Sequence, residues 1–409
     1  MGLHMLYDAY EMQRNWLAGV SAFANIGAEM LSNPRNPFAY FGGGEVLSSA
    51  LEVFAHAAAP RGKPRFGFTE TTINGEVVAV HEEIVLRKPF GQLKRFVKAG
   101  VEDAPKLLIV APMSGHYATL LRGTVERMLP KHDVYITDWR DARQVPLSDG
   151  RFDLDDYVNY VIAFLEQIGA GAHVLAVCQP SVPVYAAVAL MNGANHPATP
   201  KTLTMMGGPI DTRAAPTAVN TLATERPLAW FQNNVVTTVP YSYPGAGRKV
   251  YPGFMQLAGF MTMNLGNHLM SHYEMYKHLV AGEDLQADAT KAFYDEYRSV
   301  CDMTAEFYLQ TVKIVFQDHA LPKGEYVHRG VRVDPAVITK TAILAIEGEN
   351  DDISGVGQTK AALDIATNLP DEHKRYFLAP TVGHYGIFNG SKWRDSIAPV
   401  VEEWISTHN

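Results

Sequence analysis

Three side chains of this 409-residue sequence have the types and the chain order that nucleophilic acyl transfer requires. Cys178 comes first, Asp351 follows much later, and His384 comes last. A cysteine sulfur can attack a carbonyl carbon, a histidine can carry the proton, and a carboxylate can hold the imidazole in the required tautomer. The sequence therefore predicts a Cys-His-Asp triad in which Cys178 forms an acyl-enzyme intermediate.

Cys178 lies where a predicted strand gives way to a predicted helix. Residues 174–177 form a short apolar run typical of a buried parallel strand, and residues 184–190 are typical of a buried helix. Pro180 suits the first turn of that helix, because the first helical N–H has no partner. A nucleophile on such a strand-turn-helix is the elbow of α/β-hydrolases, usually Gly-x-Ser-x-Gly and here Ala-Val-Cys-Gln-Pro.

The predicted acid and base also follow strands. Asp351 comes after a predicted strand at residues 341–346, and His384 comes after one at residues 375–378. The order nucleophile, acid, histidine is the order that α/β-hydrolases use. All three side chains would then meet at the carboxyl edge of one parallel sheet, where open α/β sheets bind ligands.

Other residues near this edge have predicted roles in the site. The backbone N–H of Gln179, which follows the nucleophile, is predicted to be one oxyanion donor. The second donor is expected in residues 111–116, from Ser114 or alternatively Met113. His116 is a candidate for the wall of the site, and Trp139 is a candidate either for a substrate contact or for a packing turn.

Some residues compete for the triad roles. Asp352 and, more weakly, Asp211 are alternatives for the acid, while His116 and His173 are alternatives for the histidine. His173 opens a buried strand and is predicted to be structural. Cys301 lies in a helical pattern and is predicted to be inert.

The surrounding pattern predicts an α/β fold in four parts. A helical arm is expected at residues 1–65. The first part of the α/β core, residues 66–211, opens with an antiparallel edge whose short strands are expected at residues 77–80, 83–87 and 93–97. Residues 212–335 break the strand-helix alternation and are rich in aromatic residues and methionine, which predicts an inserted helical cap. The alternation resumes at residues 336–409. Such alternation predicts a mainly parallel sheet with helices on both faces.

The arm has one apolar helix face. Its residues recur at intervals of three or four: Trp16, Val20, Phe23, Ile26 and Met30. Packing of this face on the main domain is one prediction, and binding to another surface is the alternative. A break is expected at residues 33–37, Asn-Pro-Arg-Asn-Pro.

Composition excludes several classes of protein. A net charge of −8 argues against nucleic acid as a partner. Two cysteines cannot form a disulfide framework, no secretory signal is visible at the start, and no apolar run is long enough to span a membrane. No metal-ligand cluster or phosphate-binding glycine loop stands out, so no cofactor is expected. The sequence therefore predicts a cytoplasmic enzyme, and it leaves a homodimer open.

The sequence resembles the intracellular poly(3-hydroxybutyrate) depolymerases, which are α/β-hydrolases with a cysteine nucleophile. The Cys-Gln-Pro-Ser turn is the most specific part of this resemblance, which rests on residues 110–121, 137–143, 176–181, 347–353 and 383–386. The resemblance implies hydrolysis of stored polyester at the surface of polyhydroxyalkanoate granules. It also implies that the nucleophile, acid and base are Cys178, Asp351 and His384.

Two alternatives to this function remain. Polyhydroxyalkanoate synthase shares the Cys-Asp-His set but builds polymer from acyl-CoA, and its elbow is normally Gly-x-Cys-x-Gly. Ala176 and Pro180 depart from that elbow and favour the depolymerase. A granule-binding protein with an inactive hydrolase fold is the second alternative, and the intact triad argues against it.

Overall fold

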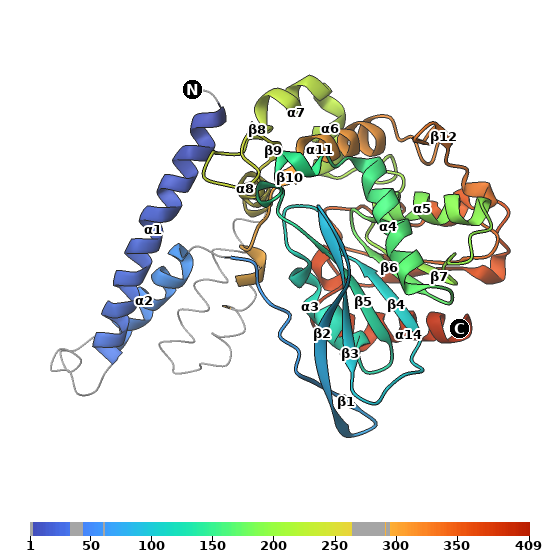
Figure 1. The fold of residues 1–409 in the computed structure, drawn as a ribbon, viewed down its shortest axis with the longest axis horizontal. Coiled ribbons are helices and arrows are strands. Elements are labelled where there is room, and N and C mark those ends of the chain that lie inside the picture. Colours follow the sequence, from blue (N-terminus) through green and yellow to red (C-terminus); the bar gives the residue numbers. More distant parts are fainter. Residues whose placement is uncertain (1–2, 33–43, 60–61, 264–290, 292–294) are drawn as a thin grey trace.

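The computed structural model describes residues 3–32, 44–59, 62–263, 291 and 295–409. The predicted break at residues 33–37 and much of the predicted cap, residues 264–290 and 292–294, lie outside these residues. The centre of the fold is a nine-stranded sheet with the order β1-β2-β3-β5-β4-β6-β7-β13-β14 (Figure 1). Its strands are β1 (Glu70–Ile73), β2 (Glu76–Lys88), β3 (Gly91–Lys98), β4 (Lys106–Val110), β5 (Asp133–Trp139), β6 (His173–Val177), β7 (Thr202–Met206), β13 (Ala342–Gly348) and β14 (Lys374–Ala379).

The sheet is antiparallel at one edge and parallel from β5 onward. β1, β2, β3 and β5 pair antiparallel in turn, whereas every pairing from β5 to β14 is parallel. The predicted strands at residues 77–80 and 83–87 are one strand, β2, which has a register shift between Ile84 and Leu86. With its crossed order β5-β4-β6 and its leading antiparallel edge, this sheet has the α/β-hydrolase fold, as predicted.

Helices cover both faces of the sheet (Figure 1). α4 and α5 pack on each other, and α3 packs on α14. These helices, with the short ones near the C-terminus, are α3 (Arg122–Met128), α4 (Leu154–Ile168), α5 (Ser181–Gly193), α12 (Ala361–Ile365), α13 (Gly390–Lys392) and α14 (Ala398–Thr407). Every residue of β6, β7 and β13 is buried, as their continuous apolar runs predict for strands covered on two sides.

The described elements between β7 and β13 lie outside the nine-stranded sheet and gather at one end of the molecule (Figure 1). β8, β9 and β10 form a small antiparallel sheet there. The elements are α6 (Ala218–Glu225), α7 (Leu228–Asn234), β8 (Thr237–Thr238), β9 (Lys249–Tyr251), α8 (Gly253–Met263), β10 (Met303–Thr304), α11 (Ala305–Thr311), a π-helical turn (Val312–Gln317), β11 (Val327–His328) and β12 (Val331–Arg332). We call this set the cap region.

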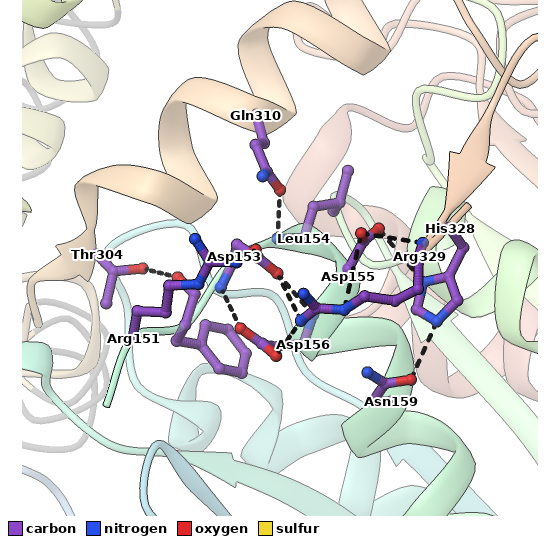
Figure 2. Close-up of polar contacts among 11 residues, drawn as sticks. Arg151, Asp153, Leu154, Asp155, Asp156, Asn159, Thr304, Gln310, His328 and Arg329 are labelled. Atoms are coloured by element: carbon purple, nitrogen blue, oxygen red, sulfur yellow. Dashed lines mark hydrogen bonds and ion pairs between the residues drawn. The ribbon is translucent and has the colours of Figure 1, made fainter. Parts of the chain in front are cut away.

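The N-terminus of α4 holds part of the cap region in place (Figure 2). Asp153 caps the helix, and its side chain and that of Asp156 accept each other's backbone N–H. Arg329, in the β11–β12 turn, donates to Asp156 over 2.5 Å, and His328 lies 3.3 Å from Asp155. Although burial opposes ionisation of Asp155, the contacts from His328 and Arg329 lower its pKa. Arg329 and His328 therefore join the hairpin to acidic side chains at a helix end that already favours negative charge.

Two helices form the predicted arm, α1 (Leu3–Ser32) and α2 (Gly44–Ala58). Only the start of α1 docks on the cap region. The hydroxyl of Tyr7 donates to Asp302 over 2.5 Å, and the Tyr10 ring stacks on Phe254 with centroids 4.0 Å apart. The rest of α1 packs on α2, and both helices stand beside the main body (Figure 1).

The predicted apolar face of α1 does not pack on the main domain. Four of its five residues are exposed, by 53% to 78% of their surface: Trp16, Phe23, Ile26 and Met30. The helix was predicted correctly, but the packing prediction is wrong, because α1 buries its smaller residues instead. None of the described helices is long and apolar enough to cross a membrane.

The stability of the fold is expected to depend on pH through Asp302, which accepts the Tyr7 hydroxyl. Burial, together with the nearby charge of Asp141, raises the pKa of Asp302 to about 7 even though Arg143 opposes the shift. A carboxyl with a raised pKa in the folded state stabilises the fold fully below its unfolded pKa of about 4 and loses that contribution as the pH rises through the folded pKa. Asp302→Asn, which cannot ionise, should therefore raise the melting temperature relative to wild type more at pH 8 than at pH 5, by roughly a few degrees.

Differential scanning calorimetry of both proteins at the two pH values measures this difference. The same gap at both pH values would mean that Asp302 does not titrate between them. The Asn side chain keeps an oxygen for the Gly253 N–H, which donates to Asp302 over 2.9 Å, so the variant removes the charge and keeps that contact.

Candidate active site

Cys178 occupies the turn between β6 and α5 in a backbone conformation that non-glycine residues seldom adopt. Its φ is +65°. The Cys178 N–H donates to the Met206 carbonyl over 2.7 Å, and the Ser181 N–H donates to the Cys178 carbonyl over 3.1 Å. These bonds hold the turn, whose strain is about 1–3 kcal/mol, and the side chain remains partly exposed. The geometry is that of the predicted nucleophile elbow.

His384 and Asp351 are in direct contact. Nδ1 of His384 lies 2.7 Å from Oδ2 of Asp351, and both side chains are buried. The other carboxylate oxygen, Oδ1, accepts the backbone N–H groups of Ile353 and Ser354 over 2.9 and 2.8 Å. The turn after β13 therefore orients the carboxylate, and the carboxylate orients the imidazole.

Cys178 is the second partner of His384. Burial alone would lower the pKa of His384, but the charges of Cys178 and Asp351 and hydrogen bonds with both side chains hold this pKa well above its ordinary value. With Nδ1 facing the carboxylate, Nε2 is the ring nitrogen available to the sulfur. The imidazole thus lies between a thiol and a carboxylate, the arrangement needed to move a proton from sulfur.

Two glycines after β7 make room for this cluster. Gly207 has a φ of +60°, and a Cβ there would lie 3.1 Å from Cε1 of His384 and 3.2 Å from Oδ2 of Asp351. A Cβ on Gly208 would lie 1.9 Å from Oγ of Ser181 in the first turn of α5. The sequence pattern indicated only a strand end here, and this close approach to the triad was missed.

A backbone donor from the loop after β4 faces the elbow. The Met113 N–H donates to the side-chain oxygen Oε1 of Gln179 over 3.2 Å. The loop therefore points this N–H at the residue that follows Cys178. Of the two predicted second oxyanion donors, Ser114 and Met113, this contact favours Met113.

Glu347 is a buried positioning residue that the sequence did not reveal. It lies in β13 and is 1% exposed. Its carboxylate accepts three backbone N–H groups between residues 357 and 360, and it also accepts the Tyr376 hydroxyl over 2.7 Å. These bonds fasten the loop that follows Asp351 to the sheet. The segment Glu-Gly-Glu-Asn-Asp reads as a polar turn, and only the tertiary structure shows that its first carboxylate points inward.

The two predicted substrate contacts are buried. Trp139 is 1% exposed, and its indole N–H donates to the Ala111 carbonyl over 2.8 Å within an aromatic core cluster. His116 is 3% exposed and contacts the Tyr297 carbonyl, and burial lowers its pKa to about 4. Trp139 thus packs in the core, which corrects its prediction as a substrate contact. His116 is buried too, and it joins the loop after β4 to the Tyr297 carbonyl.

The competing residues lie elsewhere. Asp352 is exposed, and the Asp211 carboxylate pairs with Arg213 over 2.7 Å. His173 is buried at the opposite end of β6 from Cys178 and contacts Oγ1 of Thr202 over 2.9 Å. Cys301 is buried, which raises its pKa, and it lies in an extended segment and not in the predicted helix. Among the described residues, no group of three or more His, Cys, Asp or Glu side chains could hold a metal ion.

The family of the chain follows from its C-terminal half. Residues 207–409 match the sequence model of the family described as "PHB de-polymerase C-terminus". Over these residues, the chain belongs to the PHB depolymerase family. The family resemblance predicted from the sequence is thereby confirmed. The matched segment contains Asp351 and His384, whereas Cys178 precedes it.

Solved structures similar to this depolymerase-family chain include hydrolases, at low sequence identity. They include a thermophilic esterase from Thermogutta terrifontis (TM-score 0.44, 12% identity, 84% of this chain and 98% of that chain). The 2-hydroxy-6-oxo-6-phenylhexa-2,4-dienoate hydrolase BphD from Rhodococcus sp. strain RHA1 is another (0.42, 13%, 80% and 99%). Similarity at this level says nothing about activity, and the fold assignment rests on the strand order of the chain itself. No curated protein matches the sequence significantly.

Proposed function

We propose that this protein is an ester hydrolase that cleaves poly(3-hydroxybutyrate) through Cys178, His384 and Asp351. The observation that carries the proposal is the position of His384. Its Nδ1 lies 2.7 Å from Asp351, and Cys178, at a strained elbow, is a second group that raises the pKa of its imidazole. The family match of residues 207–409 supports the polyester as the substrate.

The reaction would proceed in two halves. In the first, Sγ of Cys178 attacks the ester carbonyl carbon, its proton passes to Nε2 of His384, and the tetrahedral intermediate collapses as His384 protonates the leaving alkoxide. In the second, His384 takes a proton from water, the hydroxide attacks the thioester, and the acid product leaves as the proton returns to sulfur. Asp351 stabilises the imidazolium in both halves.

The oxyanion would be bound by two backbone donors. The N–H of Gln179 is one of them, and the N–H of Met113 is the other. In the structure Oε1 of Gln179 accepts the Met113 N–H, so a carbonyl-type oxygen already takes the place that the oxyanion would occupy. Substrate binding would require the Gln179 side chain to move away from this donor.

Assays with the polymer and with the acyl-CoA thioester as substrates distinguish a hydrolase from a synthase. Purified protein is incubated with amorphous poly(3-hydroxybutyrate) particles and, in parallel, with 3-hydroxybutyryl-CoA. Soluble 3-hydroxybutyrate or its short oligomers should appear from the particles, with no net growth of polymer from the thioester. Chain growth with release of CoA would instead identify a synthase, and binding to particles without turnover would identify an inactive granule-binding protein. In the cell, the same substrate implies a cytoplasmic protein associated with storage granules.

A further inference from the structure

The arm presents a row of large apolar side chains to solvent. On α1 this row is Met12, Trp16, Phe23, Ile26 and Met30, exposed by 53% to 78%. The spacing places all five on one side of the helix. Including α2, the two arm helices carry eight of the sixteen large hydrophobic residues that are exposed in the described part of the chain. Isolated exposed apolar residues are ordinary, but a continuous row marks an interaction surface.

The opposite side of α1 explains why this row faces outward. Small residues fill the contact between α1 and α2. Oγ of Ser21 donates to the Ala55 carbonyl over 2.8 Å, and Oγ of Ser48 donates to the Ala28 carbonyl over 3.0 Å. A Cβ on Gly27 would lie 3.2 Å from Leu51, so the helices approach closely. The hairpin is therefore held by its small residues, and the large side chains of the row are exposed to solvent.

The row matches the chemistry of an uncharged polyester. Poly(3-hydroxybutyrate) offers methyl groups and ester carbonyls along its length, which make apolar contacts and accept hydrogen bonds but provide no charge for ion pairs. α1 carries no charged residue between Arg14 and Glu29. Trp16, in the row, can donate its indole N–H to an ester carbonyl.

Charge disfavours an anionic membrane as the partner. Helices that lie on such membranes place Lys and Arg beside their apolar face. Arg14 is the one arginine or lysine in α1 and α2, whereas these helices contain five acidic residues: Asp8, Glu11, Glu29, Glu45 and Glu52. An acidic arm would be repelled by anionic lipid headgroups but not by a neutral polymer.

The base of the arm is close to the candidate active site. Tyr7 donates to Asp302, and the neighbouring Cys301 N–H donates to the Gly115 carbonyl over 2.7 Å, in the loop that carries Met113. An anchor along α1 would therefore be attached, through residues 301 and 302, to the loop that carries Met113. This is where an enzyme acting on an insoluble polymer needs an anchor.

We infer that the exposed row of α1 is the docking surface through which the protein attaches to amorphous poly(3-hydroxybutyrate), an assignment that rests on the proposed function. The row binds polymer segments outside the active site and keeps the enzyme at the particle between cleavage events. Loss of the row should therefore impair attack on particles and spare attack on soluble esters.

A double substitution on the row tests this role. Trp16→Glu with Phe23→Glu places two charges in the row, and Ala22→Glu with Asn25→Glu places the same charges at exposed positions of α1 outside it. Binding is measured by sedimentation with polymer particles in a Cys178→Ala background, so that the polymer is not consumed. The row variant should bind at least about tenfold more weakly, while the control pair binds like its parent. With Cys178 intact, the row variant should degrade particles correspondingly slowly and hydrolyse a soluble 3-hydroxybutyrate ester at the wild-type rate.

Several results would overturn the assignment. Unchanged particle binding by the row variant, or equal losses in the row and control pairs, would remove α1 from the docking surface. A parent protein that sediments with lipid vesicles and not with polymer would identify a membrane surface instead. A dimer that becomes a monomer in light scattering with particle binding retained would identify a self-association face. Failure of wild type to hydrolyse any polymer would contradict the proposed function separately, since the binding assay does not depend on turnover.

Discussion

Cys178→Ala is expected to lower kcat on a soluble 3-hydroxybutyrate ester by about 10⁴-fold or more, with the fold retained. Without the sulfur no acyl-enzyme can form, and the residual rate would come only from binding and the oxyanion donors. Alanine is smaller than cysteine and should cost little stability, because Cys178 is only half-buried where it packs against the core. Steady-state kinetics with a chromogenic or soluble oligomeric ester, together with circular dichroism, measures both parts of this expectation.

The second cysteine of the chain provides the matched control. Cys301 is buried, and its sulfur donates to the His116 carbonyl. Cys301→Ala should keep wild-type kinetics at a modest cost in stability. Iodoacetamide should inactivate wild type and Cys301→Ala alike and label one thiol, that of Cys178. An active Cys178→Ala protein would mean that another residue is the nucleophile.

The sequence predicted the fold because its elements are locally consistent. Continuous apolar strands such as β6 and β7 alternate with helices in the chain, and this alternation allows few arrangements other than a parallel sheet with helices on both faces. The exact ends of the strands were less predictable. The two short strands expected at residues 77–80 and 83–87 are one, because the polar residues between them, His81 and Glu82, stay paired with β3 while their side chains face solvent.

The arm shows what periodicity cannot determine. The recurrence of Trp16, Phe23 and Ile26 correctly predicts a helix with one apolar side. It does not show what that side contacts, and the usual expectation of core packing is wrong here. Ser21, Ala24 and Ala28 bury their side of α1 instead. Contacts between small residues leave only a weak pattern in a sequence, so the surface-binding alternative could be recognised only from exposure.

In the candidate site, too, some residues could be predicted from the sequence and others could not. Chain order and strand ends were enough to bring Cys178, Asp351 and His384 together, because the carboxyl edge of a parallel sheet gathers whatever follows its strands. The residues that support these three side chains could not be predicted from the sequence. Gly207 is required because a larger residue would crowd His384 and Asp351, and Glu347 is required because it accepts backbone N–H groups of residues 357–360. Neither requirement can be read from the residues next to them in the sequence. Trp139 was misplaced because a strand end can turn a side chain toward the core as readily as toward a ligand.

Asp351→Asn is expected to lower kcat by about 10³-fold or more, whereas Asp352→Asn should leave it unchanged. The two carboxyls are adjacent in sequence and differ in their surroundings. Asp351 is buried against Nδ1 of His384, and Asp352 is exposed. An amide at position 351 can present its NH₂ group to Nδ1, which would favour the tautomer with a proton on Nε2 and leave no base facing the sulfur. The loss should appear in kcat and in the rate of alkylation of Cys178.

The same pair of variants separates a catalytic role from a structural one. The charge of Asp351 is one cause of the high pKa of His384, so its removal should lower that pKa, as measured from the pH dependence of the imidazole NMR signal. A carboxylate that only fastened its loop would change the melting temperature and leave the pKa of His384 where it is. Asp351→Asn should also keep Oδ1 as the acceptor for the N–H groups of Ile353 and Ser354, so the turn should survive. Loss of activity in Asp352→Asn alone would assign the acid to Asp352, and that result would require the turn after β13 to rearrange when substrate binds.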